Sequence, residues 1–254
     1  MLKNKIVFIT GASSGIGAAC AKQFAKSGAK LLLCARRIEK LNELAMQLQE
    51  YGAEVYVFQL DVRQHSQVKN SLKTLPEKWK NIDILLNNAG LAAGLDTLQE
   101  GDINDWEEMI DTNVKGLLYI TKEILPQMIE RNSGHIINIG SIAGHVVYPK
   151  GAVYCATKYA VNALSNGLRM DLLGTKIRVS TIDPGMVESN FSLVRLKGDV
   201  ERAKAVYEGM DPLTPNDIAD AVLYCATRPP HVNISEIIIM PTDQASATMV
   251  ARKK

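Results

Sequence analysis

Residues 5–17 of the chain, KIVFITGASSGIG, decide how the rest of it folds. Apolar and aromatic residues up to Thr10 predict a strand, which runs into a turn with three glycines and then into a helical pattern. In a parallel α/β sheet a dinucleotide pyrophosphate docks at such a turn, because glycines let the backbone approach it and helix N–H groups face its charge. We therefore expect these residues to bind a dinucleotide: Gly11, Ser13, Ser14, Gly15, Ile16 and Gly17. The spacing Gly-x-x-x-Gly-x-Gly differs from the common Gly-x-Gly-x-x-Gly, and a ligand-free connection is the alternative interpretation.

The same alternation of strand and helix continues to the C-terminal part of the chain. Apolar runs predict strands over 5–10, 30–35, 54–60, 82–87, 134–140, 176–183 and 234–240. Helical patterns fill the gaps over 15–27, 37–51, 65–79, 102–131, 151–173 and 214–227. Several strands are apolar throughout, as in parallel strands buried on both faces. The fold class predicted is α/β: a doubly wound parallel sheet with helices on both faces, in one domain over 1–254.

The end of the second predicted strand indicates which dinucleotide binds. An acidic residue there would bind the ribose hydroxyls of NAD, but Ala35 takes that position and Arg36 and Arg37 follow it. Guanidinium groups suit a 2′-phosphate, so the sequence favours NADP, with Arg36 as the leading ligand and Arg37 or Ser13 assisting. The alternative is that both arginines merely open the next helix, where positive charge is unfavourable.

Composition narrows the possible functions. The chain has 254 residues, a formal net charge of +2 and no basic stripe, which argues against nucleic acid as a partner. Its four cysteines lie in apolar runs without metal-ligand spacing, so we expect no metal. No signal peptide or membrane span is expected, and the chain should be soluble and cytoplasmic.

Tyr154 and Lys158 lie one turn apart on the predicted helix 151–173, with Ser141 shortly before them at a strand end. A phenol with a pKa of about 10 is a poor acid or base at neutral pH. A nearby ammonium group favours the phenolate, so we expect Lys158 to lower the pKa of Tyr154 and let it exchange a proton with an alcohol or carbonyl. Each residue alone has an ordinary structural interpretation; their combination with the glycine-rich turn favours catalysis.

Taken together, these residues resemble those of the short-chain dehydrogenase/reductase family, and the resemblance covers essentially the whole length of the sequence. The matching residues are Thr10-Gly11-x-x-x-Gly15-x-Gly17, Asp61, Asn87-Asn88-Ala89-Gly90, Asn113, Ser141, Tyr154-x-x-x-Lys158 and Pro184-Gly185. The resemblance implies a seven-stranded Rossmann-like sheet, usually in a homotetramer. It also implies catalysis by Ser141, Tyr154 and Lys158, with Asn113 interrupting its helix to hold a proton-relay water.

The resemblance extends the expected cofactor site beyond the glycine-rich turn. Asp61 would meet the adenine, with Val62 beside it, and residues 87–90 would shape the floor, with Asn87, Ala89 and Gly90 as contacts. Tyr154 and Lys158 would contact the cofactor as well as act in catalysis. Pro184, Gly185 and Val187 would complete the site, and Ser189, where related sequences often have Thr, would approach the nicotinamide carboxamide.

The substrate is indicated by closer resemblance. Residues 140–145, 183–188, 191–195 and 234–241 look like those of NADP-dependent 3-hydroxy acid dehydrogenases, a group that includes serine 3-dehydrogenases and L-allo-threonine dehydrogenases. Such a substrate would contact Ser141 and Tyr154 and needs a cation for its carboxylate, for which Arg195 is the first candidate and Lys150 and His145 the next. The long segment 189–212 is expected to cover the substrate.

Two other functions stay open on the sequence. One is reduction of another carbonyl class, such as 3-oxoacyl thioesters, as other members of the family perform. The other is an inactive NADP-binding regulatory subunit, although such proteins commonly lose the Tyr or the Lys.

Overall fold

Seven parallel strands form one sheet in the structure of this chain, a computed structural model that describes residues 2–253. The strands are β1 Ile6–Thr10, β2 Lys30–Ala35, β3 Val55–Gln59, β4 Ile84–Asn87, β5 Gly134–Ile139, β6 Ile177–Pro184 and β7 Glu236–Ile239. Their order across the sheet is β3-β2-β1-β4-β5-β6-β7, so the direction of winding reverses between β1 and β4. In open sheets of this kind a crevice forms at the carboxyl ends of the strands where the order reverses.

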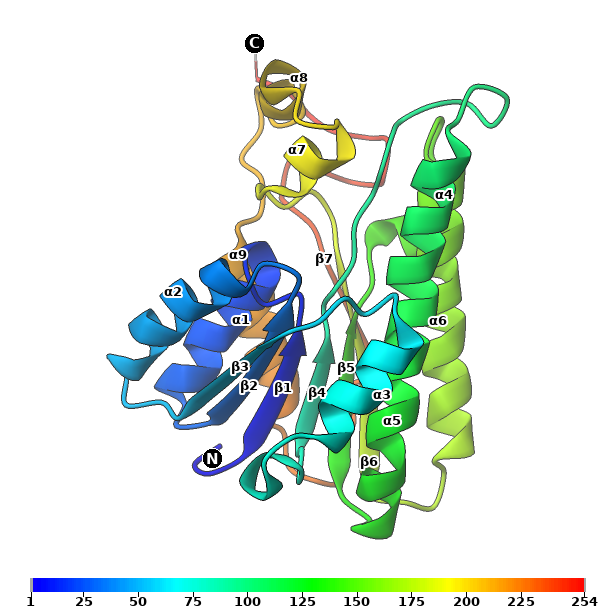
Figure 1. Cartoon of the computed structure of the whole chain (residues 1–254). Coiled ribbons are helices and arrows are strands. Elements are labelled where there is room, and N and C mark those ends of the chain that lie inside the picture. The colour runs from blue at the N-terminus through cyan, green and yellow to red at the C-terminus, as the bar shows by residue number, and fades with distance from the viewer. Residues whose placement is uncertain (1, 254) are drawn as a thin grey trace.

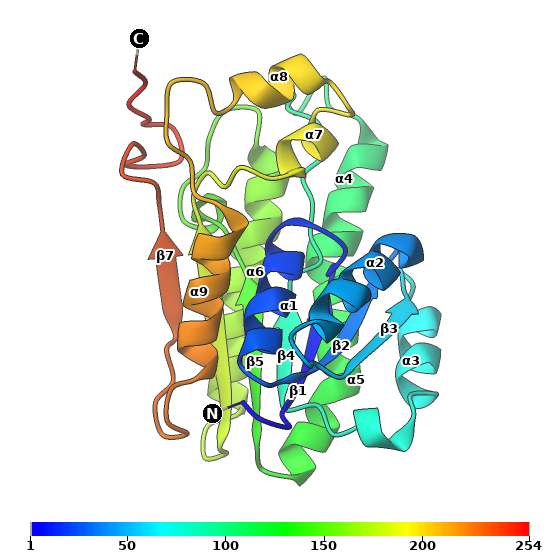
Figure 2. The same ribbon diagram turned by 90° about the vertical axis from the view of Figure 1, so that its left-hand side faces the viewer.

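Helices cover both faces of the sheet (Figures 1 and 2). One face carries α1 Gly15–Lys26, α2 Ile38–Gln49 and α9 Pro215–Ala226. The other face carries α3 His65–Lys73, α5 Leu117–Glu130 and α6 Ala152–Asp171. Along β1, Val7 and Ile9 belong to the first core and Phe8 to the second, because successive side chains of a strand point to opposite faces. The predicted fold class is confirmed.

Two predicted helices differ from the structure. The helix expected over 65–79 ends at Lys73, and a separate 3₁₀ turn, Glu77–Trp79, follows Pro76, which lacks the N–H needed to continue a helix. The helix expected over 102–131 consists of α4 Ile103–Ile110, a π-helical segment Asp111–Gly116 and α5.

The segment after β6 has more regular structure than the sequence predicted. Two short helices, α7 Phe191–Arg195 and α8 Val200–Ala205, lie beyond the carboxyl ends of the strands (Figure 1). The backbones of Val187 and Leu213 pair at its two ends, where Glu188 N–H donates to the Leu213 carbonyl. The segment therefore leaves the sheet and returns to the same place, over the edge where the predicted site residues lie. Within residues 2–253, every helix is too short or too polar to cross a lipid bilayer.

Candidate active site

The glycine-rich turn is fixed to the end of β4 by Asn88. The Asn88 amide donates to the carbonyls of Thr10 and Gly11, at 2.9 and 3.1 Å, and Thr10 Oγ1 accepts the backbone N–H groups of Asn88 and Ala89. A Cβ at Gly17 would lie 2.5 Å from that amide nitrogen, and one at Gly11, whose φ is +64°, would lie 2.8 Å from the Ala89 Cα. The turn needs glycine at both positions, and the resulting bare backbone before α1 fits the pyrophosphate of a dinucleotide.

Arg37 contacts this turn directly. Its Nη2 donates to Ser13 Oγ and Ser14 Oγ, both at 3.0 Å, at the N-terminus of α1. Arg36 instead pairs with Glu108 of α4 at 3.3 Å. Arg37 rather than Arg36 lies on the turn, because its side chain, after the strand has ended, folds back over it; which of the two binds a 2′-phosphate stays a prediction.

Asp61 lies within a network of charges. Arg63 donates to its carboxylate through Nη2 at 2.6 Å and Nε at 3.0 Å, and also bonds Glu108, the partner of Arg36. Burial raises the pKa of Asp61, but Arg63 outweighs burial and the pKa lies below its ordinary value. Asp61 is thus an ionised acceptor after β3, and the predicted contact with adenine stays a prediction. Val62 lies beside it and packs against Gly116, whose missing side chain leaves room for it.

The Asn87 side chain lies inside the protein, and its expected contact with the cofactor stays a prediction. Its amide points into the interior, where it donates to Thr121 Oγ1 at 3.0 Å and Asn138 Oδ1 at 2.9 Å. Asn87 therefore joins β4 to β5 and α5 and does not line the edge of the sheet. The floor of the site begins one residue later, with Asn88, Ala89 and Gly90, because neighbouring residues of an extended chain face opposite ways.

Asn113 lies in the π-helical segment, so the predicted interruption of its helix is confirmed. Its side chain bonds both backbone groups of Leu91, at 2.8 and 2.9 Å, and donates to Thr157 Oγ1 of α6 at 3.0 Å. A Cβ at Gly90 would lie 3.2 Å from Asn113 Oδ1 and 3.7 Å from Lys158 Nζ. Asn113 thus ties the floor of the site to the helix that carries Lys158, while its water relay stays a prediction.

Ser141, Tyr154 and Lys158 come together at the carboxyl end of β5. Ser141 begins a short 3₁₀ turn, accepts the Ala143 N–H at its Oγ, and forms a hydrogen bond with the Tyr154 side chain. Lys158 Nζ lies 5.9 Å from the centre of the Tyr154 ring and donates to the Ile139 carbonyl at 2.9 Å. All three side chains are buried, as a site that excludes water requires.

The expected effect of Lys158 on Tyr154 is not what this geometry gives. Burial raises the pKa of Tyr154 above its ordinary value, and the groups that oppose this are Ser141 and Arg195. Burial also lowers the pKa of Lys158 from 10.5 to about 8, with Asp183 opposing it. The prediction failed because removal from water disfavours both charges at once, and the Lys158 ammonium points to the Ile139 carbonyl.

Arg195 lies over Tyr154. Its guanidinium carbon is 5.6 Å from the centre of the Tyr154 ring, and it donates to the Gly94 carbonyl at 3.2 Å and the Tyr148 hydroxyl at 2.9 Å. Nη2 has no hydrogen-bond partner within residues 2–253 and can bind an anion. Lys150 lines the same pocket as Tyr154 and Arg195. The structure therefore brings two of the three predicted cations to the pocket.

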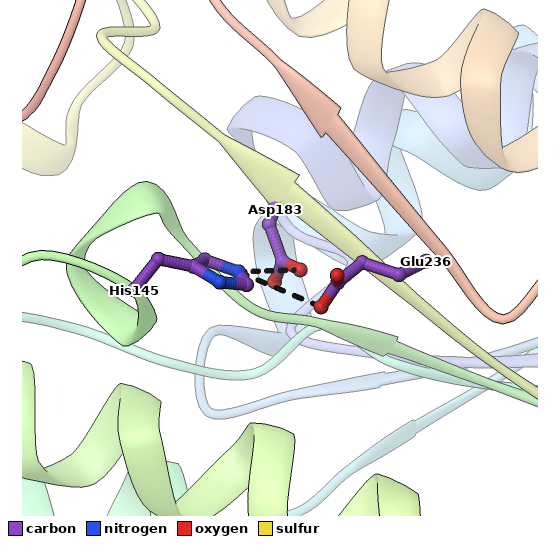
Figure 3. A group of neighbouring side chains, drawn as sticks. All are labelled: His145, Asp183 and Glu236. Atoms are coloured by element: carbon purple, nitrogen blue, oxygen red, sulfur yellow. Dashed lines mark hydrogen bonds and ion pairs between the residues drawn. The ribbon is translucent and has the colours of Figure 1, made fainter.

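His145, the third predicted cation, does not line this pocket. Its Nε2 lies 3.1 Å from Asp183 Oδ2 and 3.5 Å from Glu236 Oε1 (Figure 3). The imidazole already contacts two carboxylates at the β6–β7 side of the site, so the structure does not bring it to the pocket that Arg195 and Lys150 line.

Residues 184–189, at the end of β6 and just after it, lie next to the glycine-rich turn at the carboxyl edge of the sheet. Gly185 lies against the buried Gln244, whose Oε1 accepts the Met186 N–H at 2.8 Å; a Cβ at Gly185 would collide with that amide. Ser189 lies across from the glycine-rich turn: a Cβ at Gly15 would be 3.8 Å from the Ser189 Cβ. Gly185 and Ser189 thus lie at the edge of the sheet that carries the glycine-rich turn. The contacts of Pro184, Gly185, Val187 and Ser189 with a cofactor stay predictions. Gln244 was missed, since a lone amide near the end of a chain has no local signal.

Comparisons with known proteins agree with this geometry. The family described as short chain dehydrogenase matches residues 5–197. The NADP-dependent 3-hydroxy acid dehydrogenase YdfG of Salmonella typhi is 48% identical over 243 residues, which are 95% of this chain and 97% of that protein. An NADP-dependent 3-hydroxy acid dehydrogenase of Schizosaccharomyces pombe is 42% identical over 255 residues, covering 100% of this chain and 98% of that one. The closed form of a serine dehydrogenase complexed with NADP+ superposes with a TM-score of 0.92 at 46% identity, over 98% of this chain and 100% of that chain.

The buried Lys158 predicts a pH-dependent gain in stability for Lys158→Met. Because the pKa falls from 10.5 to about 8 on folding, the ammonium destabilises the fold below about pH 8, and this cost disappears above the unfolded pKa of 10.5. The cost of burying the ammonium corresponds to about 3 kcal/mol. Lys158→Met removes this cost but also loses the hydrogen bond to the Ile139 carbonyl, which offsets about 1–2 kcal/mol of the gain. Denaturant unfolding of the cofactor-free protein should show Lys158→Met more stable at pH 7 and less stable than the parent at pH 10.5. Equal differences at both pH values would contradict this account.

Proposed function

The chain belongs to the short chain dehydrogenase family, and we propose that it is an NADP-dependent oxidoreductase acting on the 3-hydroxyl group of small 3-hydroxy acids, such as serine or L-allo-threonine. One observation carries the choice of substrate: the Arg195 guanidinium lies over the Tyr154 ring, with Ser141 and Lys158 close by. The names of the similar proteins support both the cofactor and the substrate class.

In oxidation, the substrate hydroxyl donates its proton to the Tyr154 phenolate as the carbon–oxygen double bond forms. Ser141 donates its hydroxyl hydrogen to the same substrate oxygen and keeps it in line with the phenol. NADP+, when bound, supplies the acceptor for the hydride that leaves the substrate carbon. Burial of Tyr154 disfavours the phenolate, so the Ser141 hydroxyl and the positive charge of Arg195 have to stabilise it.

Arg195 also supplies the group that selects an acid. Its Nε and Nη1 are held by Gly94 and Tyr148, so Nη2 keeps a fixed direction for a carboxylate. A 3-hydroxy acid carries its carboxylate two carbons from the reacting one, which suits a cation placed above the ring of the acid–base group. Lys150, exposed at the mouth of the same pocket, would add a second, weaker positive charge.

NADP is the cofactor that the chain's own residues fit. Arg37 contacts the two serines of the glycine-rich turn, and Ala35 leaves no carboxylate at the end of β2 to repel a 2′-phosphate. Arg37 and Ser13 would hold the phosphate, and Arg36 would approach it on release from Glu108. Asp61, Ala89, Gly90, Gly185, Val187 and Ser189 would line the remainder of the site.

We also expect a homotetramer in the cytoplasm. Leu118 and Ile129 of α5 are 41% and 48% exposed and lie in an apolar groove with Leu125 and Leu168. Such a surface supports packing against another copy of the chain.

Tyr154→Phe is the decisive test of the chemistry. We expect kcat for oxidation of L-serine or L-allo-threonine, followed as NADP reduction at 340 nm, to fall by roughly 10²–10⁴-fold, because the substrate proton has no acceptor. Binding of NADP should be kept. Parallel assays with a neutral secondary alcohol and a 3-oxoacyl thioester identify the substrate class. Unchanged turnover in Tyr154→Phe would refute the mechanism, and tight NADP binding without turnover of any substrate by the parent protein would favour a regulatory role.

Arg195→Met tests the carboxylate contact. The ratio kcat/KM for hydroxy acids should fall by about 10–100-fold, the usual weight of a lost charge-assisted hydrogen bond, while a neutral alcohol is much less affected. Arg202→Met, on the exposed face of α8, is the matched control and should change neither substrate. Equal losses for charged and neutral substrates would show that Arg195 acts only through Tyr154 or the loop.

Arg37→Gln tests the cofactor preference without any turnover. Calorimetry should show NADP bound about 10–100-fold more weakly and NAD nearly unchanged, because only the 2′-phosphate loses its partner. Lys40→Gln, one turn further along α2 and exposed, is the control. A variant that binds NADP as well as the parent protein assigns the 2′-phosphate to Arg36 instead.

A further inference from the structure

A group of three titratable side chains lies next to Ser141 and outside the pocket that Tyr154 and Arg195 line. It consists of His145, Asp183 and Glu236, which come from the 3₁₀ turn after β5, from β6 and from β7 (Figure 3). The Asp183 side chain has no exposed surface, His145 is 25% exposed and Glu236 40% exposed. The group therefore extends from the buried site to the edge of the sheet.

The Asp183 carboxylate touches the backbone of a proposed catalytic residue. Its Oδ1 accepts the Ser141 N–H at 3.1 Å, and its Oδ2 faces His145. A Cβ at Gly140 would lie 1.7 Å from Oδ1, so the carboxylate reaches Ser141 only because residue 140 has no side chain. Both oxygens of this carboxylate are thus committed, one to Ser141 and the other to the imidazole.

His145 is held in place by α6. The Tyr159 hydroxyl donates to its carbonyl, and the Asn162 amide donates to the Gly144 carbonyl at 3.2 Å and lies 3.1 Å from His145 Nε2. The three side chains carry donor atoms that metals use, and the Asn162 side-chain amide lies beside the same Nε2. We interpret the group as a polar network in which the Asp183 carboxylate contacts the His145 imidazole, extended by Glu236.

Asp183 also influences the charge of Lys158. Lys158 Nζ donates to the Ile139 carbonyl and Asp183 Oδ1 accepts the Ser141 N–H, so both charges contact the same short stretch of backbone at the end of β5. The negative charge of Asp183 favours the charged forms of Lys158 and of Arg169. His145 and Glu236 are the charged groups that face it from the 3₁₀ turn and from β7. Burial raises the pKa of Asp183; His145 opposes this rise and Glu236 adds to it. The charge on Asp183 thus depends on two partners that act in opposite directions.

We propose that Asp183 is a positioning residue that fixes the backbone of Ser141 and keeps Lys158 charged, and that His145 and Glu236 regulate it from the edge of the sheet. The proposal rests on the proposed function only for the roles of Ser141 and Lys158. Asp183 contacts the backbone N–H of Ser141 and not its hydroxyl, which is the group proposed to meet the substrate.

The test is a double-variant cycle on stability, which needs neither cofactor nor substrate. The stability gained by Lys158→Met is measured from pH 6 to 11 in the parent protein and in Asp183→Asn, which keeps an oxygen acceptor for the Ser141 N–H but loses the charge. Without that charge the Lys158 ammonium is disfavoured further, so the gain should be larger at pH 7. Its decline with rising pH should begin at a lower pH in Asp183→Asn than in the parent protein. A gain with the same size and pH profile in both backgrounds would overturn the proposal.

Two further variants keep the proposal open to test if Asp183→Asn does not fold. His145→Gln removes the partner that favours the Asp183 carboxylate, and Glu236→Gln removes the one that disfavours it. The acid limb of the kcat profile should therefore move to higher pH in His145→Gln and to lower pH in Glu236→Gln, with KM little changed. If the acid limb moves in the same direction in both variants, or moves in neither, the regulatory part of the proposal is rejected. If the parent protein turns over none of the substrates, the stability cycle still decides the role of Asp183.

Discussion

The contact between Asn88 and the glycine-rich turn is the constraint on which the rest of the site depends. It joins the ends of β1 and β4, the two strands between which the sheet reverses direction. Fixing Asn88 also places Gly90, two residues later. A Cβ at Gly90 would lie 3.2 Å from Asn113 Oδ1 and 3.7 Å from Lys158 Nζ. This contact of the Asn88 side chain with the turn therefore sets both the surface for the cofactor and the distance from that surface to the catalytic helix.

Burial is the dominant electrostatic effect in this site. It disfavours the phenolate of Tyr154 and the ammonium of Lys158 together, and a simple pair of one acid and one base does not overcome that. The compensating charges come from outside the pair: Arg195 of α7 lies over the Tyr154 ring, and Asp183 lies at the end of β6, the strand beside β5. Neither belongs to α6, which carries Tyr154 and Lys158, so the reactivity of the tyrosine is a property of the assembled fold.

The sequence predicted the sheet well and the side-chain partners less well. Strand β2 was predicted at its observed bounds, 30–35, because a strand buried on both faces has an unmistakable apolar run. Helices α7 and α8, of five and six residues, are too short to show a period. The side-chain partners of Arg36 and Asn87 could not be predicted, because their neighbours, Arg37 and Asn88, have the same chemistry and only the fold decides which of two adjacent side chains faces the site. The contacts of His145 had no local signal, because Asp183 and Glu236 are distant from it in sequence.

The segment that covers the pocket is fixed at more points than a mobile loop would be. Arg195 is hydrogen-bonded to Gly94 through both its backbone and its side chain, and Phe191 packs edge-on against Tyr154 with ring centres 5.7 Å apart. Tyr207 closes the segment on itself through Ser192 and the Val187 carbonyl. A guanidinium held this way needs little reordering to receive a carboxylate, so less of the binding energy is lost as entropy. The same contacts make Arg195 part of the acid–base site as well as part of the covering segment, because moving it away from a substrate would also move it away from Tyr154.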